Sequence, residues 1–323
     1  MRRKRRGQPI HGWVAVDKDI GFTSTQVVGR VRSIFDAQKA GHAGTLDPLA
    51  TGVLPIALGE ATKTVPYVMD GTKVYRFTAG FGEARDTDDL EGRVIASSDI
   101  RPDDAAILAA LPAFTGTLSQ VPPVYSAIKI AGVRSYKKAR DGDGESPPAR
   151  NVEISRFELV DRLDPDHAVF EVECGKGTYI RSLARDLGVR LGTVAYVSEL
   201  RRTLCGPFSE KDAISLDKLA ESMLSATPQD TLLPVTTALD DIPALAMTDT
   251  QTDHLRHGRA VRARRGSTIF VDANKLDALR DGDVLCAMSG EIPVALVRLE
   301  GEEIQPVRVL NIEGAHRPSA ETE

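Results

Sequence analysis

The chain has 323 residues, of which 41% are hydrophobic and 27% charged, so it can fill packed cores and is not disordered throughout. This length favours two folded domains. The three cysteines form no CxxC pair, and no apolar run approaches the roughly 18 residues of a membrane span. We therefore expect a cytoplasmic protein with no disulfide, no membrane segment and no secretory signal. No dimerising helix or large apolar stripe is evident, so we also expect a monomer.

The charges are distributed unevenly along the chain. The net charge is -5, yet residues 2–6 are all Lys or Arg, and five arginines gather between residues 256 and 265. We interpret residues 1–11 as a basic disordered tail. An acidic protein with separate basic patches can bind nucleic acid on one face, although a solvated tail and a solvated strand explain the same pattern.

The first part of the chain predicts strands around a glycine-containing loop. Thr23 or Ser24 can cap a helix whose apolar residues, Val27, Val31 and Ile34, share one face. The other elements expected here are a strand at 12–18, a loop at 41–52, strands at 53–58 and 73–81, and a helix at 102–111 with proline in its first turn.

Residues 119–150 are rich in Pro, Gly and basic residues, which predicts an insertion that projects from the sheet. After it we expect strands at 152–160 and 168–174, a helix from about residue 180 that ends at Gly188, and a strand at 194–203. From residue 239 the sequence predicts a small barrel-like domain that ends near residue 312, before a loose tail at 313–323. Its expected elements are a helix at 250–257 and strands at 260–263, 268–272, 284–288, 293–299 and 304–310.

The loop from His42 to Pro48 is the strongest local candidate for chemistry. Pro48 restricts the preceding residue, Asp47, to an extended or turn conformation. The glycines of the loop allow a ligand to come close. Such a loop can hold one carboxylate rigidly, although an ordinary Asx turn has the same sequence pattern. Arg181, near the start of the helix that follows residue 174, can pair with a carboxylate from elsewhere, or can be a plain surface arginine.

Other kinds of site fail on spacing. Phe170 stands where a phosphate-binding P-loop needs its first glycine. Asp86, Asp88 and Glu91 suggest a calcium loop, but Leu90 occupies a position that must supply oxygen, so we interpret this acidic turn as solvated. His254 and His257 lack further ligands for zinc. We therefore expect no metal site.

Six segments in a fixed order resemble the TruB family of tRNA pseudouridine synthases. They are VAVDKDIGFTS, GHAGTLDPLATGVLPIALGEATK (41–63), KVYRF, VPPVYSAIK, KGTYIRSLARDLG and ELRRT. The resemblance implies an α+β catalytic domain at 12–238, with a mixed, mostly antiparallel sheet and flanking helices, and a PUA-type RNA-binding domain at 239–312. It also implies that uridine-55 in the T-loop of tRNA is isomerised to pseudouridine, without metal or other cofactor.

The resemblance also implies roles for individual residues. Asp47 would be the nucleophile, Arg181 its ion-pair partner, and Tyr75 would stack on the uracil and remove the C5 proton. The remaining matched residues would line the pocket or contact RNA: Lys18, His42, Lys63, Tyr125, Lys129, Tyr179 and Leu200. His42 would fill the gap left by the flipped uridine, and the insertion at 119–150 would close on the stem-loop.

Two positions depart from the family pattern. Asp19 replaces a usual proline and Arg85 a usual threonine, which puts the shape of these two loops in question. Two other functions stay open at this point. One is a non-catalytic protein that binds or folds tRNA with the same groove, and the other is a metal-dependent hydrolase built around His42 and Asp47.

Overall fold

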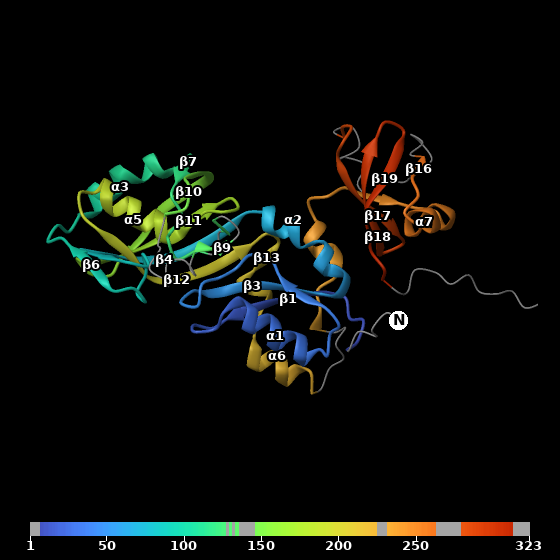
Figure 1. Ribbon diagram of the computed structural model, residues 1–323, viewed down its shortest axis with the longest axis horizontal. Helices are drawn as coiled ribbons and strands as arrows, with labels where there is room; N and C mark the ends of the chain where they lie inside the picture. The colour runs from blue at the N-terminus through green and yellow to red at the C-terminus, as the bar shows by residue number, and fades with distance from the viewer. Residues whose placement is uncertain are drawn as a thin grey trace, which may run out of the picture.

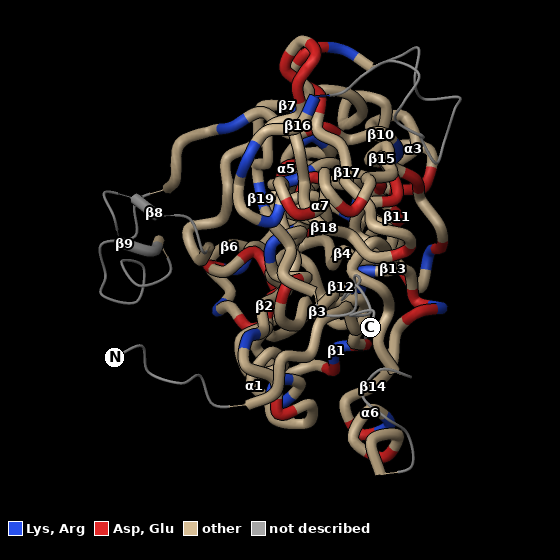
Figure 2. Tube along the Cα trace, turned by 90° about the vertical axis from the view of Figure 1, so that its right-hand side faces the viewer, with Lys and Arg blue, Asp and Glu red and all other residues tan. Residues whose placement is uncertain are grey.

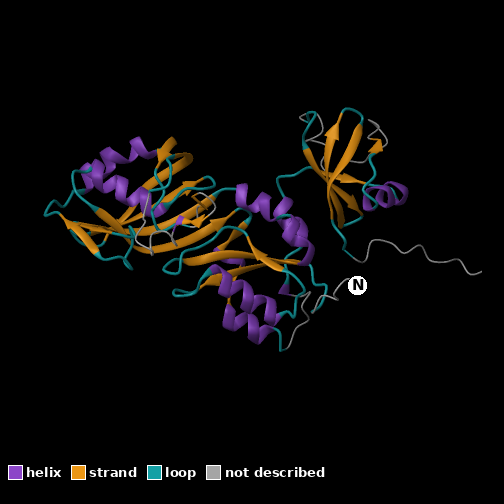
Figure 3. Cartoon of the chain, viewed as in Figure 1, coloured by secondary structure: helices purple, strands orange, loops and turns teal. Residues whose placement is uncertain are grey.

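The computed structural model describes residues 7–126, 129–130, 133–135, 146–224, 231–262 and 279–312. It contains one large sheet flanked by helices and a second, smaller sheet formed by the C-terminal residues (Figures 1 and 3). The predicted fold class, a mixed α+β fold followed by a small β fold, is confirmed.

The large sheet is mixed and mostly antiparallel, as predicted. Its main path runs in the order β14 (Ala213–Ser215), β1 (Gly12–Lys18), β3 (Thr51–Leu58), β12 (Ala195–Cys205), β4 (Lys73–Phe81), β11 (His167–Cys174), β10 (Arg150–Arg162), β7 (Gly116–Gln120). Two short strands, β2 (Ala40–His42) and β13 (Phe208–Ser209), join β3 and β12. Only the pairs β1–β14 and β3–β12 of this sheet are parallel among the described strands.

Helices cover the two halves of this sheet separately. On one half, α1 (Ser24–Ile34) contacts α6 (Leu216–Ser222). On the other half, α5 (Ile180–Arg190) packs on β12, and α3 (Asp104–Ala110) packs on β10 (Figure 1). Each half has its own apolar cluster, and the side chains of Tyr75 and Leu200 pack against both clusters. The centre of the sheet, where β3, β12 and β4 meet, therefore joins the two cores.

The smaller sheet has five strands, with α7 (Asp249–Arg256) packed against it. Its order is β15 (Ala244–Ala246), β17 (Val284–Ser289), β18 (Ile292–Glu300), β19 (Glu303–Val309), β16 (Val261–Arg262). The strand predicted at 268–272 lies outside the described residues. The last described segment returns to the first domain, because Leu310 is buried in one cluster with Trp13 and Phe208.

The remaining elements are short. They are η1 (Gly59–Lys63), α2 (Val65–Asp70), β5 (Glu83–Arg85), β6 (Val94–Ser97), η2 (Leu111–Phe114), β8 (Lys129–Ile130), β9 (Val133–Arg134), η3 (Glu210–Asp212) and η5 (Val235–Leu239). Strands β8 and β9 form a hairpin within the predicted insertion. Its other residues at 127–128, 131–132 and 136–145 lie outside the described part.

Some predicted boundaries differ from the structure for local reasons. The helix expected at 102–111 begins at Asp104, because the side chain of Asp103 caps it by accepting a hydrogen bond from the Ala106 amide at 2.7 Å. Helix α5 continues past Gly188 instead of ending there. A Cβ at this glycine would lie 2.7 Å from the Ala195 nitrogen, so the residue serves close packing of α5 on β12.

The N-terminal segment packs on the catalytic domain further upstream than predicted. Residues 1–6 of the expected tail lie outside the described part. Gln8, however, pairs with Ala37 and donates its amide hydrogen bond to the Asp36 carbonyl at 2.6 Å. Ile10 is buried. Residues 8 and 10, which were predicted to belong to a disordered tail at 1–11, therefore pack on the rest of the chain.

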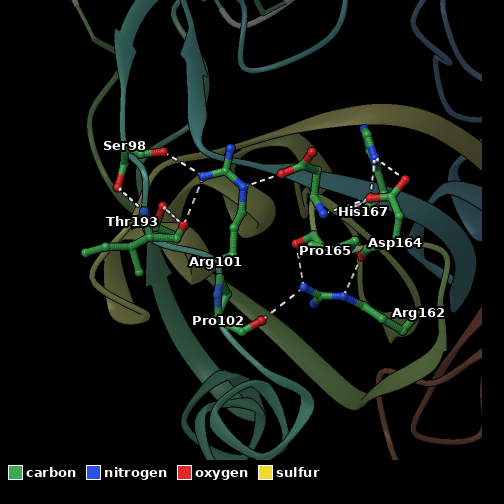
Figure 4. A network of polar contacts seen from close by, with 10 residues as sticks. Ser98, Arg101, Pro102, Arg162, Asp164, Pro165, His167 and Thr193 are labelled. Atoms are coloured by element: carbon green, nitrogen blue, oxygen red, sulfur yellow. Dashed lines mark hydrogen bonds and ion pairs between the residues drawn. The ribbon is translucent and has the colours of Figure 1, made fainter.

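The loops at the outer end of the catalytic domain are tied by two arginines (Figure 4). Arg162 donates to the carbonyls of Pro102 at 3.0 Å and Pro165 at 2.6 Å, and Arg101 pairs with Asp166. The Thr193 hydroxyl donates to the Ile100 carbonyl at 3.0 Å. These contacts join the segment before α3 to the β10–β11 turn and to the segment before β12.

Acidic and basic residues are interspersed along the described trace (Figure 2). On the outer face of β10, β11 and β4, Arg156 pairs with Glu158 at 2.6 Å and with Glu171 at 2.8 Å, and Arg76 pairs with Glu171 at 3.1 Å. These arginines are matched by carboxylates, so this face is not a free basic patch.

Candidate active site

The loop that carries Asp47 is fixed from two sides. The hydroxyl of Ser24, the first residue of α1, donates to the Leu46 carbonyl at 3.0 Å and accepts from the Leu46 amide at 2.9 Å. The Gly21 amide donates to the Pro48 carbonyl at 2.8 Å. Backbone contacts directly before and after Asp47 therefore set its position.

Lys18, at the end of β1, holds the loop that carries Asp47 through a hydrogen bond to the Pro48 carbonyl. Its side chain is fully buried, and its ammonium donates to the carbonyls of Phe22 at 2.8 Å, Asp19 at 3.0 Å and Pro48 at 3.2 Å. Burial lowers the pKa of Lys18 to about 8, although the nearby carboxylate of Asp47 acts in the opposite direction. Lys18 thus lies behind the loop that carries Asp47, where it holds the Pro48 carbonyl.

Asp47 and Arg181 form the predicted ion pair. The guanidinium Nη2 lies 2.8 Å from Oδ2 of Asp47, and the arginine side chain is only 5% exposed while the aspartate is 36% exposed. Arg181 also donates to the carbonyls of Thr87 at 2.9 Å and Tyr125 at 3.0 Å. A buried guanidinium, held at both terminal nitrogens, therefore faces a carboxylate that solvent can reach.

A second carboxylate holds Arg181 from the other side. Asp89 is 5% exposed, and its Oδ2 lies 3.3 Å from Nη1 of Arg181. Burial raises the pKa of Asp89, and the Thr87 hydroxyl and Arg181 oppose that effect. Sequence reasoning missed this residue, because it belongs to an acidic turn that we interpreted as solvated. The residue pattern of this turn does not indicate that it packs against α5, which lies more than ninety residues later in the chain.

A cavity of about 290 Å³ opens beside this ion pair. Among its lining residues are five of the predicted site residues: Asp47, Tyr75, Tyr179, Arg181 and Leu200. Further lining residues that carry charge are Lys73, Arg150, Lys176 and Arg202. The pocket is thus lined by apolar and aromatic side chains, by several cationic side chains and by the carboxylate of Asp47.

The aromatic side chains occupy distinct places in this wall. Tyr75 lies on β4, and burial raises the pKa of Tyr75 to about 12, so it is a neutral phenol at pH 7. Tyr179 stands directly before α5, and the guanidinium of Arg150 lies over its ring at 4.8 Å from the centroid.

Sequence reasoning also missed Arg202, whose side chain is fully buried on β12. Its guanidinium donates to the carbonyls of Val53 at 2.8 Å and Gly44 at 3.0 Å. It belongs to the ELRRT segment of a predicted strand but was given no role, and its neighbour Arg201 is a partly exposed arginine. The residue type and the strand pattern therefore give no sign of its burial.

Besides Lys18, three predicted contact residues lie outside the pocket lining, namely His42, Lys63 and Tyr125. His42 ends β2, and its Nδ1 is buried without a hydrogen-bond partner among the described residues. Burial, aided by the charge of Arg202, lowers the pKa of His42. Lys63 pairs with Glu60 at 2.5 Å and donates to the Val309 carbonyl at 2.6 Å, so it joins the two domains. Tyr125 reaches the site through its carbonyl.

Lys129 was also predicted to contact RNA. It belongs to strand β8, and its side chain lies outside the described part of the structure.

The two positions that depart from the family pattern have clear local contacts. The carbonyl of Asp19 accepts a hydrogen bond from Lys18. The guanidinium of Arg85 lies 4.6 Å from the ring centroid of Tyr196 and donates to the carbonyls of Leu90 at 3.2 Å and Gly92 at 3.1 Å. Arg85 thereby closes the turn that presents Asp89 to Arg181.

Within the described ranges, no group of three His, Cys, Asp or Glu side chains is placed to hold a metal ion. All three cysteines are free and buried. No helix in the described part is long and apolar enough to span a membrane.

Solved structures share this fold. A chain of the H/ACA RNP bound to a substrate RNA containing 2'-deoxyuridine superposes with a TM-score of 0.72 at 22% identity, and the match covers 98% of this chain and 93% of that chain. A chain of a Cbf5-Nop10-Gar1 complex gives a TM-score of 0.71 at 26% identity, with 93% and 84% covered.

Sequence relatives are much closer. The tRNA pseudouridine synthase B of Gluconacetobacter diazotrophicus is 56% identical over 96% of this chain and 100% of its own length. That of Rhodospirillum rubrum is 50% identical over 97% of this chain and 100% of its own length. Residues 32–180 match the N-terminal domain of TruB family pseudouridylate synthases, and residues 181–240 match the C-terminal domain of tRNA pseudouridylate synthase B. The chain therefore belongs to the TruB family of pseudouridylate synthases.

Proposed function

We propose that this protein isomerises uridine-55 in the T-loop of tRNA to pseudouridine, with Asp47 as the nucleophile. The observation that carries the proposal is the ion pair of Asp47 with the buried Arg181 at the edge of a cavity lined by Tyr75, Tyr179 and Leu200. A cavity of about 290 Å³ lies near the lower end of the range for small-ligand pockets, roughly 300–1,000 Å³.

The reaction breaks the bond between N1 of uracil and C1′ of the ribose and joins C1′ to C5. Its net proton movement is from C5 to N1, so it needs neither a redox partner nor water. A carboxylate nucleophile can hold the substrate covalently while the base turns. Asp47 suits this role because its loop is fixed on both sides and its carboxylate is accessible.

The uridine must leave its stack to enter the pocket, at a cost of a few kcal/mol. The wall of Tyr75, Tyr179 and Leu200 offers aromatic and apolar surface to a flipped pyrimidine. Tyr75 is the proposed acceptor of the C5 proton. His42, on the loop before Asp47, is the proposed occupant of the space that the base leaves in the RNA.

Cations around the pocket can contact the phosphates on either side of this uridine. Arg150 and Lys176 line the cavity, and Lys176 is largely exposed. Such contacts position RNA without reading its sequence. We propose that the insertion at 119–150 and the C-terminal domain extend this contact to the rest of the tRNA.

The test is incubation of the protein with an unmodified tRNA transcript in EDTA, followed by mapping of pseudouridine by position. We expect modification at position 55 alone, and none in a transcript with cytidine at that position. A tRNA that is bound but never modified would support the non-catalytic RNA-binding role. Activity that is lost in EDTA would support metal-dependent chemistry instead.

A further inference from the structure

Arg202 is a buried cation whose contacts are unusual for an arginine. Its side chain is 1% exposed, and no carboxylate among the described residues forms a salt bridge with it. Its hydrogen bonds go to two backbone carbonyls, those of Gly44 and Val53. Burying a charge without a counter-ion costs free energy. The charge of Arg202 therefore suggests an interaction with a neighbouring group.

The neighbouring group is the hydroxyl of Tyr75. Arg202 and Tyr75 face each other as cross-strand partners of β12 and β4, and both line the cavity. Directly opposite residues of an antiparallel pair have their side chains on the same face of the sheet, so the guanidinium and the phenol are neighbours. The charge of Arg202 lowers the pKa of Tyr75 against the larger raising effect of burial. The other titratable groups that face this hydroxyl, Cys174 and Cys205, are buried thiols.

The proposed reaction makes a demand on this oxygen. When C5 has bonded to C1′, the C5–H bond must break, its electron pair restores the C5–C6 double bond, and a proton reaches N1. Tyr75 can accept the C5 proton only after its hydroxyl has given up its own proton, to N1 or to solvent. That exchange places negative charge on an oxygen in a pocket of low polarity, where such charge is costly.

We propose that Arg202 is a positioning residue of the isomerisation, which holds the Tyr75 hydroxyl against the flipped base and stabilises the negative charge on its oxygen during removal of the C5 proton. This inference rests on the proposed function. The same guanidinium holds the Gly44 carbonyl, three residues before Asp47, so it also fixes the distance between the nucleophile loop and Tyr75. Positive φ at Gly44 and the close approach of Arg202 Nη1 leave little room for a side chain there.

The test compares single-turnover rates on tRNA that carries either hydrogen or deuterium at C5 of uridine-55. Arg202→Lys keeps the positive charge but loses the planar guanidinium and its several N–H donors. Removal of the C5 proton should therefore slow by about 100-fold. The C5 isotope effect should then be larger than in the wild-type protein. The matched control is Arg201→Lys, because Arg201 pairs with Asp17 at 3.0 Å and with Glu210 at 2.5 Å outside the pocket.

The control should keep the wild-type rate and isotope effect. A slow Arg202→Lys protein with an unchanged isotope effect would overturn the inference, because loose packing alone slows all steps together. Wild-type protein that makes no pseudouridine would instead overturn the proposed function. If Arg202→Lys does not fold, the inference is tested by a crystal structure of the wild-type protein with a T-loop RNA that contains 5-fluorouridine. It should show Arg202 on the Tyr75 hydroxyl, and a guanidinium turned away from it would refute the inference.

Discussion

The buried carboxylate of Asp89 lies 3.3 Å from the guanidinium of Arg181, on the side away from Asp47. Arg181 therefore bridges two carboxylates, of which only Asp47 faces the pocket. Asp89 holds one terminal nitrogen of the guanidinium, and the other terminal nitrogen holds the carboxylate of Asp47.

Asp89→Asn should slow isomerisation while tRNA affinity stays unchanged, because Asp89 does not line the cavity. A hydrogen bond to a charged group contributes about 1.5–3 kcal/mol, so we expect a roughly 10- to 100-fold lower single-turnover rate. The control is Asp88→Asn, because Asp88 pairs with Arg185 at 3.0 Å and not with Arg181. Equal rates for the two variants would show that the bridge to Asp89 is unimportant.

Lys18 should make stability depend on pH in the alkaline range. Its pKa is about 8 in the folded protein and 10.5 in the unfolded chain, so between these values the unfolded chain binds more protons. The free energy of unfolding should therefore rise from pH 8 to pH 10.5 by up to about 3 kcal/mol from this group. Denaturant titrations at several pH values measure this free energy. The wild-type protein should show the rise and Lys18→Met should lack it, and the same pH dependence in both proteins would contradict the buried charge.

Tyr75→Phe should separate binding of the base from removal of its proton. The ring remains to pack against uracil, but the hydroxyl is gone, so tRNA binding should persist while product formation falls at least about 100-fold. Tyr75→Leu should lose activity and also bind the flipped base more weakly. Filter binding and release of label from [5-³H]uridine measure the two effects. Wild-type turnover by Tyr75→Phe would assign the C5 proton to another acceptor.

Lys63→Ala should loosen the connection between the two domains. The variant loses the hydrogen bond to the Val309 carbonyl, while the Glu60 carboxylate keeps its hydrogen bond from the Asn311 amide at 2.8 Å. We expect faster amide exchange at 309–311, a stability loss of about 1 kcal/mol and weaker tRNA binding. The rate at saturating tRNA should not change. Lys218→Ala, an exposed lysine on α6, is the control, and identical exchange in both variants would refute this role.

The sequence predicted those parts of the fold that depend on local patterns. Alternation at 73–81 predicted the bounds of β4, and the choice of Thr23 or Ser24 as cap predicted the start of α1, where the structure has Thr23 as the N-cap. Residues whose role depends on distant contacts were not predictable in this way. Gly188 looked like the end of a helix, but its role depends on Ala195 across the packed strand.

The same division holds for the site. Asp47 and Arg181 were candidates from their local sequence, and the family resemblance gave their pairing and added Tyr75. The structure brings all three to one pocket. Asp89 and Arg202 were missed because a charged residue in a turn or a strand is usually solvated. Only the assembled fold buries them, and no local spacing carries that information.

The central claim is that the carboxylate of Asp47 performs the chemistry. The most direct measurement is single-turnover pseudouridine formation by Asp47→Ala on a tRNA transcript, with tRNA binding measured in parallel and Asp19→Ala as the neighbouring control. We predict no product at position 55 from Asp47→Ala, with binding close to that of the wild-type protein and full activity in the control. Pseudouridine formed by Asp47→Ala at the wild-type rate would contradict the account.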